Sequence, residues 1–192
     1  MKNTIAEENQ TLFKETLQLH HEAEAHSFGA AMSKGELSEQ QWADWMGALT
    51  QLYVVIDPYL PDALKRTRDL FNDLLALSSK EIYPRYSYHA DDVAGMIADG
   101  ATNVGYVAGM CYILAGANLR GGQIVRKAVE KRDFPCSHLM FNEEDVASKE
   151  AAMKWLDNLR ASTGTAVIKG AQDAFADMID IMEEIWDNSN KE

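Results

Sequence analysis

Apolar residues recur along most of the chain with the three- and four-residue spacing of an α-helix. Ser38 and Gln41 have the spacing of a capping box, in which each side chain accepts a hydrogen bond from the other residue's backbone N–H. Pro58 indicates where the helix that starts there ends. The apolar positions between them are Trp42, Trp45, Met46, Leu49, Tyr53 and Ile56.

Five further stretches have the same helical spacing, and no stretch alternates convincingly between apolar and polar residues as a half-buried strand would. The aromatic, proline-containing stretch 83–89 predicts a loop instead. The further helices are expected at 11–28, after Asp62, at 103–132, at 142–159 and after Gly164. The last has the longest apolar stripe, with Val167, Ile168, Ala171, Phe175, Met178, Met182 and Ile185 on one face.

These elements predict an all-α fold in one domain. A chain of 192 residues can bury roughly 70% of its unfolded surface, so the core needs no disulfide or structural metal. We therefore expect a single-domain helical bundle over residues 1–192, with frayed ends at 1–10 and 188–192.

The charge narrows the classes of partner. A net charge of -12 would repel nucleic acids and anionic membranes. The sequence has no apolar run long enough to span a membrane and no charged-then-apolar leader, so we expect a cytoplasmic protein. Cys111 and Cys136 lie in unlike contexts without paired spacing, which favours free thiols.

The first expected helix carries a candidate metal ligand. Phe13, Leu17, His20 and Glu24 follow steps of four, three and four, so His20 and Glu24 share an apolar face and are expected to point towards the interior. A neutral imidazole there could bind iron while the carboxylate holds its other N–H. From this helix alone, a core histidine satisfied by hydrogen bonds is the stronger interpretation.

Two other metal sites have little support. His21 and His26 are five residues apart, whereas a zinc protease helix needs two histidines four apart on one face. No Glu precedes a His by three residues, the spacing that di-iron and di-manganese bundles use.

The expected helix at 103–132 is unusually rich in glycine. An interior glycine costs about 1 kcal/mol relative to alanine, so something must offset the loss. Close packing against another helix is one explanation, and a kink against a large flat ligand is another. Three of the glycines lie within residues 116–122, about two helical turns, and this clustering favours the explanation by a ligand. The glycines are Gly105, Gly109, Gly116, Gly121 and Gly122.

Together, the two helices resemble the heme oxygenase family. The stretch with His20, Glu24, Phe28 and the pair 34–35 is similar to the family's proximal helix and the turn after it. The glycine-rich stretch 112–123 resembles the distal helix, whose bend lies over the heme.

Two smaller matches extend the resemblance, so that it runs in order from His20 to Phe175. Tyr53 is similar to a tyrosine of the family's second helix, and Ala174 with Phe175 looks like a pocket-lining pair on its last helix. The chain departs from many members at two positions in the bend. Asn118 replaces an aspartate and Ala117 replaces a glycine, which affects the expected proton delivery more than heme binding.

The resemblance implies heme between a proximal and a kinked distal helix, with His20 as the axial ligand of the iron and Glu24 as its partner. Heme would be both substrate and cofactor, used with O2 and an external reductant. The catalytic residues implied are Tyr53, Gly116, Asn118 and Gly121. The heme-binding residues are His20, Glu24, Tyr112, Ala117, Gly121, Gly122 and Phe175, with Lys14, Lys149 and Lys154 as propionate candidates by placement only.

The activity implied is the opening of heme to biliverdin, with the alpha position favoured because it is common in the family, and release of carbon monoxide and ferrous iron. The chain has no flavin or nicotinamide fingerprint, so electrons must come from a donor such as ferredoxin. An acidic donor could dock on the basic residues Arg120, Arg126, Lys127, Lys131 and Arg132. The alternatives are a heme carrier without catalysis and a non-heme enzyme of the same fold.

Overall fold

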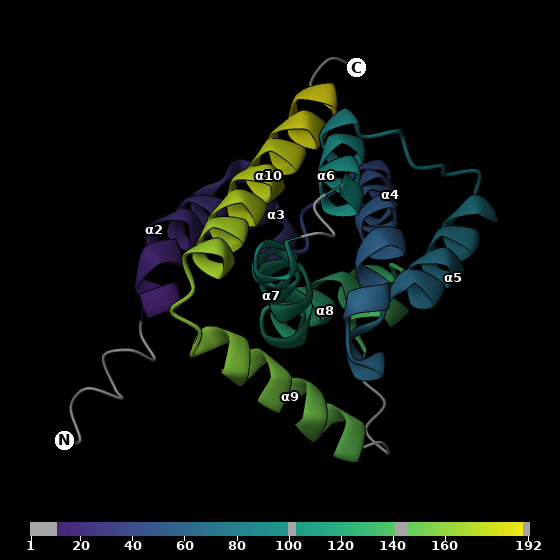
Figure 1. Ribbon diagram of the computed structural model, residues 1–192. Helices are drawn as coiled ribbons and strands as arrows, with labels where there is room; N and C mark the ends of the chain where they lie inside the picture. Colours follow the sequence, from purple (N-terminus) through teal and green to yellow (C-terminus); the bar gives the residue numbers. More distant parts are fainter. Residues whose placement is uncertain (1–10, 100–102, 141–145, 190–192) are drawn as a thin grey trace.

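The computed structural model describes residues 11–99, 103–140 and 146–189, except for the side chains of Thr11, Phe13 and residues 117–120. Every regular element in these ranges is a helix (Figure 1), which confirms the predicted all-α class. The α-helices are α2 (Thr11–Ala25), α3 (Ser27–Lys34), α4 (Glu39–Ile56), α5 (Thr67–Ser78), α6 (Tyr88–Asp99), α7 (Val104–Arg120), α8 (Gly122–Val129), α9 (Val146–Arg160) and α10 (Thr165–Ser189). The 3₁₀ turns are η1 (Asp57–Tyr59), η2 (Asp62–Leu64), η4 (Glu130–Arg132) and η5 (Ser137–Leu139).

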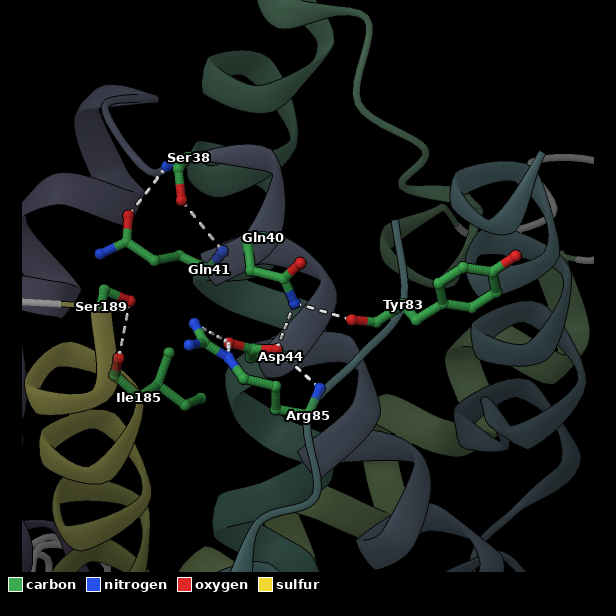
Figure 2. Close-up of polar contacts among 8 residues, drawn as sticks. All are labelled: Ser38, Gln40, Gln41, Asp44, Tyr83, Arg85, Ile185 and Ser189. Atoms are coloured by element: carbon green, nitrogen blue, oxygen red, sulfur yellow. Dashed lines mark hydrogen bonds and ion pairs between the residues drawn. The ribbon is translucent and has the colours of Figure 1, made fainter. Parts of the chain in front are cut away.

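Helix α4 forms the centre of the core and contacts α5, α6 and α10. The predicted capping box is confirmed: the Ser38 hydroxyl accepts from the Gln41 N–H at 3.1 Å, and the Gln41 side chain accepts from the Ser38 N–H at 2.8 Å (Figure 2). The helix ends at Ile56, two residues before Pro58, as predicted. Its fully buried side chains include Trp42, Met46, Leu52, Tyr53 and Ile56.

A buried carboxylate ties the loop after α5 to α4. Asp44 accepts from the backbone N–H and the Nε of Arg85 at 2.7 and 2.8 Å, and Gln40 bridges Asp44 to the Tyr83 carbonyl (Figure 2). A carboxylate only 4% exposed needs such partners because an unpaired buried charge is costly. The loop that precedes α6 is therefore fixed against the core.

Helices α7 and α10 are in backbone contact. A Cβ added at Gly109 would lie 2.0 Å from the Val167 carbonyl oxygen, and one at Gly170 would lie 2.0 Å from the Tyr106 carbonyl oxygen. The Tyr106 hydroxyl also donates to Asp173 at 2.8 Å. Gly109 therefore serves close helix packing, the first of the two explanations for the glycines of this helix.

The first predicted helix, 11–28, is two helices in the structure. It breaks at His26, whose Nδ1 accepts from the Phe28 N–H at 3.2 Å and so caps the start of α3. Gly35 then ends α3 with φ of 72°, a conformation that glycine adopts readily. The sequence pattern missed this break because apolar spacing continues through it.

Helix α6 was not predicted, and it begins at Tyr88, within the last two residues of the loop expected at 83–89. The Ser87 hydroxyl caps α6 by accepting from the Ala90 N–H at 3.1 Å. Glu184 of α10 accepts from the Tyr88 N–H at 3.1 Å. A carboxylate at a helix N-terminus is favourable, but a partner nearly a hundred residues away leaves no local signal.

The helix predicted at 103–132 divides at Gly121 into α7 and α8 and ends in the turn η4. The helix predicted at 142–159 corresponds to α9, and residues 142–145 lie outside the described residues. Helix α10 continues to Ser189, past residue 188 where fraying was expected. None of the described helices is long and apolar enough to span a membrane.

Candidate functional site

His20 lies on α2 where that helix contacts α10. Its ring meets the ring of Phe175 edge-on, with the centroids 5.7 Å apart. Its Nδ1 is 3.6 Å from Oε1 of Glu24, one helical turn later. Because the carboxylate faces Nδ1, Nε2 is the ring nitrogen that remains to bind a metal ion.

The prediction that His20 and Glu24 face the interior is wrong for this structure. Their side chains are 48% and 67% exposed. The buried face of α2 contains Leu12 and Thr16 instead, and it is offset by one residue from the row that contains His20. One residue turns a helix by about 100°, so the histidine lies on the flank of α2.

The neighbouring histidine occupies a different face of α2. A groove of about 480 Å³ is lined by His21 and Lys14 together with Leu17, Gln18, Glu22 and Ala25. The two histidine rings are perpendicular, with centroids 6.3 Å apart. Of the two histidines, only His20 has a ring contact with Phe175, so it is the candidate ligand on the side of α10. Lys14 lines the groove of His21 instead.

Helix α10 connects the two sides of the candidate site. It contacts both α2 and α7 (Figure 1). Ala174 is fully buried and Phe175 is partly buried against the core. The ring of Phe175 therefore reaches from the core to His20 on the flank of α2.

On the opposite side of α10, Tyr53 of α4 anchors α7. Its side chain is fully buried, and its hydroxyl donates to the Leu114 carbonyl at 3.2 Å. The predicted residue Tyr112 is partly buried on the same helix. Tyr53 therefore acts on the backbone two residues before Gly116.

Gly116 differs from Gly109 in what surrounds it. Among the described atoms, a Cβ added at Gly116 would meet only Leu156, at an ordinary contact distance of 3.7 Å. Helix packing against the described residues therefore does not require a glycine there. The two explanations for the glycines thus apply to different parts of α7. Gly109 allows close packing against α10, and a glycine that lies against a flat ligand remains the explanation for Gly116.

The helix break follows at Gly121, which is exposed, whereas Gly122 is buried. Directly after the break, Gln123 donates to the Leu139 carbonyl at 2.9 Å. The predicted residues Ala117 and Asn118 belong to the backbone of α7, and their side chains lie outside the described residues. The bend is therefore flanked by anchors at Leu114 and Gln123.

A buried Asp–His pair supports the second anchor, and the sequence analysis missed it. Asp73 of α5 accepts from the backbone N–H groups of Ser137 and His138 at 2.9 and 3.0 Å, and its Oδ2 lies 2.7 Å from Nδ1 of His138. Burial acts to raise the pKa of Asp73, but the hydrogen bonds from His138 and Ser137 outweigh it and lower that pKa. In the sequence, Asp73 could have been noticed only as a polar residue between Leu70 and Leu77, on the helix face that these two leucines bury.

The basic residues near the break do not form one open patch. Arg126 pairs with Glu130 at 2.6 Å. Arg132 donates to the Gly35 carbonyl at 2.8 Å and lies over the Phe134 ring. The exposed cations of this cluster include Lys127 and Lys131, and the side chain of Arg120 lies outside the described residues.

The remaining lysine candidates lie on α9. Lys149 and Lys154 are exposed, and α9 contacts both α2 and α7. The two cysteines are free, as predicted, and both are buried. Burial raises the pKa of the Cys111 thiol to about 12 and that of Cys136 to about 11, so neither is a thiolate ligand at neutral pH.

The donor chemistry suits a planar iron macrocycle. A neutral imidazole with a carboxylate near Nδ1 is a good ligand for iron. The adjoining Phe175 supplies an aromatic surface, and Gly116 leaves space on α7 among the described atoms. The residues present therefore fit an iron macrocycle bound through His20.

Comparisons with known proteins bear on the family and the fold. The family model described as heme oxygenase matches residues 7–184. The chain is similar to the crystal structure of heme oxygenase-1 from the cyanobacterium Synechocystis sp. PCC6803 in complex with heme, with 20% identity, a TM-score of 0.79 and coverage of 96% of this chain and 94% of that one. It is also similar to heme oxygenase from Leptospira interrogans, with 20% identity, a TM-score of 0.75 and coverage of 92% and 98%. No curated protein sequence matches.

Proposed function

Because this chain belongs to the heme oxygenase family, we propose that it opens heme to biliverdin and releases carbon monoxide and ferrous iron. The observation that carries the proposal is the arrangement around α10, with His20 and Glu24 on one side and the glycine-rich part of α7 on the other. The cytoplasm is the proposed location, and the alpha position is the proposed site of ring opening.

On the proximal side, His20 binds iron through Nε2. Glu24 near Nδ1 favours the tautomer with a proton on Nδ1 and limits rotation of the ring. The edge of Phe175 restricts the ring from the side of α10. The bound heme supplies the oxygen chemistry, and these residues supply its position.

On the distal side, the protein sets the shape of the backbone. The bond from Tyr53 to the Leu114 carbonyl and the bond from Gln123 to the Leu139 carbonyl hold the segment between them. Asn118 lies in this segment and is the proposed hydrogen-bonding side chain. Gly116 and Gly121 let the backbone approach a flat ligand closely, because they lack a Cβ.

The heme propionates need cations or hydroxyl donors. Tyr112 on α7 and Lys149 and Lys154 on α9 are the proposed partners, because α9 contacts both α2 and α7. Lys14 remains a candidate, although it lies in the groove of His21.

Electrons are proposed to come from an acidic donor such as ferredoxin, which docks beside the exposed Lys127. Reversing the charges at Arg126 and Lys127 should slow ferredoxin-driven turnover and leave hemin affinity unchanged. Reversal at the exposed Arg68 of α5 is the matched control. Unchanged turnover in the Arg126 and Lys127 variant would reject this docking surface.

The test of the function is to add hemin and then a reductant under air, while recording the visible spectrum. We expect a Soret band that decays to the spectrum of biliverdin, with release of carbon monoxide. A stable Soret band would instead indicate a heme carrier, and no Soret band would indicate a non-heme enzyme of the same fold. Either of these results contradicts the proposal.

A further inference from the structure

The turns that end α3 and η4 lie against each other. Gly35 ends α3, and Asp133 ends η4, the turn that continues α8; their φ angles are 72° and 54°. A Cβ added at Gly35 would lie 2.7 Å from the Ala128 carbonyl oxygen, so the backbones of α3 and α8 are in contact. The left-handed conformation is unfavourable for a residue with a side chain, so the turn at Asp133 is kept against a local cost.

Arg132 joins the two turns. Its Nη1 donates to the Gly35 carbonyl at 2.8 Å, across 97 positions of sequence. The backbone N–H groups of Gly35 and Glu36 bond back to the carbonyls of Met32 and Ala31, at 3.1 and 2.8 Å. The last turn of α3 is thus closed by its own bonds, and the Gly35 carbonyl beyond it accepts from the other wall of the contact.

The Arg132 guanidinium is oriented by an aromatic pair. It lies over the Phe134 ring, 4.9 Å from the centroid. That ring is buried and stacks on Trp42 of α4, with the centroids 6.4 Å apart. The indole Nε1 of Trp42 donates to the Pro135 carbonyl at 2.9 Å. A charged donor held in this way by the core makes a stronger hydrogen bond than a freely moving side chain would.

This contact connects the two sides of the candidate heme site. Helix α3 begins just after the break at His26, which follows the helix that contains His20. Helix α8 begins at Gly122, directly after the bend. Helix α3 contacts both α2 and α8, and α8 contacts α7. The path through Arg132 is therefore separate from the one through α10.

We propose that Arg132 is a positioning residue that fixes the spacing between the proximal helix and the distal bend. Its bond to the Gly35 carbonyl holds the end of α3 against the end of α8. Without this bond the two sides separate more readily, and heme between them leaves faster. The effect on heme rests on the proposed function, whereas the contact itself involves no heme and is tested separately.

The first experiment measures hydrogen exchange of the Glu36 and Phe134 amides in the full-length, heme-free protein. These amides bond to carbonyls within their own turns, at 2.8 and 3.3 Å. Arg132→Met keeps most of the apolar stem but removes the donor, so it should raise exchange of both amides about tenfold, the loss expected for one net hydrogen bond. Lys131→Met removes an exposed cation one residue earlier; it is the matched control and should change neither amide.

Exchange at Glu36 distinguishes the proposal from a local role of Arg132. A side chain that stabilised only its own turn would change the Phe134 amide and leave Glu36 alone. Arg132→Lys keeps a donor for the Gly35 carbonyl and should restore most of the protection of both amides. Unchanged exchange at Glu36 in Arg132→Met, or equal loss of protection in Arg132→Lys, would overturn the proposal. If Arg132→Met aggregates, Arg132→Ala supplies the donor-free variant for the same comparison.

The second experiment measures the rate at which the hemin complex loses hemin to an excess of apomyoglobin. Arg132→Met should lose hemin about fivefold faster than wild type, a smaller factor than one full hydrogen bond because α10 still holds the two sides. Its axial-ligand spectrum should match that of wild type, because His20 is unchanged. A wild-type rate of hemin loss would contradict the role in spacing. If wild type binds no hemin, the proposed function fails, while the exchange measurement still decides whether Arg132 joins α3 to α8.

Discussion

The two sides of the candidate heme site are built differently. The proximal side is one histidine on the flank of α2, with a carboxylate at 3.6 Å and an aromatic ring at its edge. The distal side is a helix in backbone contact with α10 at Gly109 and bonded to α4 through Tyr53. His20 is about half exposed, whereas Tyr53 and Gly109 are buried.

This difference separates two requirements of the proposed chemistry. Binding iron needs one nitrogen with the correct tautomer, which a single side chain can supply. Directing a reaction to one position of a macrocycle needs a surface held within a fraction of an ångström. We therefore expect substitutions on the distal side to affect the fold, and those on the proximal side to affect mainly the ligand.

The largest effect is expected where α7 and α10 meet. Gly109→Ala and Gly170→Ala should each destabilise the protein by about 3 kcal/mol, because the added Cβ meets a carbonyl oxygen. Gly95→Ala in α6 has no described atom within 4 Å of the added Cβ and should stabilise by about 0.5 kcal/mol. Urea unfolding measures all three, and a stable Gly109→Ala protein would remove the contrast between the two sides.

An intermediate effect is expected at Asp73, which supports the anchor after the helix break. Asp73→Asn should cost about 2 kcal/mol at neutral pH, because it weakens hydrogen bonds to a buried carboxylate. The pKa of Asp73 is lowered in the folded state, so its contribution is present above the ordinary carboxyl pKa and lost as pH falls below it. The variant should therefore lose less stability on acidification than wild type.

Thermal unfolding between pH 3 and pH 7 tests this expectation, with the exposed Asp99→Asn of α6 as the control. Equal pH dependence of the Asp73→Asn and wild-type proteins would show that the Asp–His pair does not stabilise the fold.

The smallest effect is expected on α10, between the two sides. Burial, followed by the charges of Asp173 and Asp180, raises the pKa of Asp177 to about 6. A raised carboxyl pKa means that the folded state binds the proton more tightly, so stability should rise as pH falls from above 6 towards 4. Asp177→Asn should add about 1 kcal/mol at pH 7.5 and reduce this dependence.

The exposed Asp187→Asn, on the same helix, is the control for Asp177→Asn and should leave the pH dependence intact. If Asp177→Asn is less stable than wild type at pH 7.5, the Asp177 carboxylate stabilises the fold at that pH. This result would contradict a raised pKa for Asp177.

Features that depend on nearby residues were predictable from the sequence. The capping box of Ser38 and Gln41 and the end of α4 before Pro58 were predicted correctly, because both partners lie within one turn. The long apolar stripe of α10 was also predicted, because its pattern continues from Val167 to Ile185, over about five turns. The glycines of α7 indicated a special helix, although the sequence alone did not show that Gly109 and Gly116 have different surroundings.

Features that depend on distant partners were not predictable. Helix α6 relies on Glu184 for its cap, and the burial of Arg66 relies on packing that no local pattern encodes. Which side of α2 is buried depends on its packing against α10. The sequence pattern therefore predicted the row with His20 as the buried face, whereas the buried face is the row one residue earlier, with Leu12 and Thr16. For the site, the family resemblance gave His20 as the proposed ligand, while packing decided how exposed its side chain is.

The most direct measurement compares hemin binding by wild type, His20→Ala and His21→Ala. Each protein is titrated with hemin, and the axial-ligand spectrum is recorded with and without added imidazole. We expect His20→Ala to lose the spectrum and to regain it with imidazole, and His21→Ala to keep it. An unchanged spectrum in His20→Ala, or its loss in His21→Ala alone, would contradict the central claim that His20 binds the heme iron.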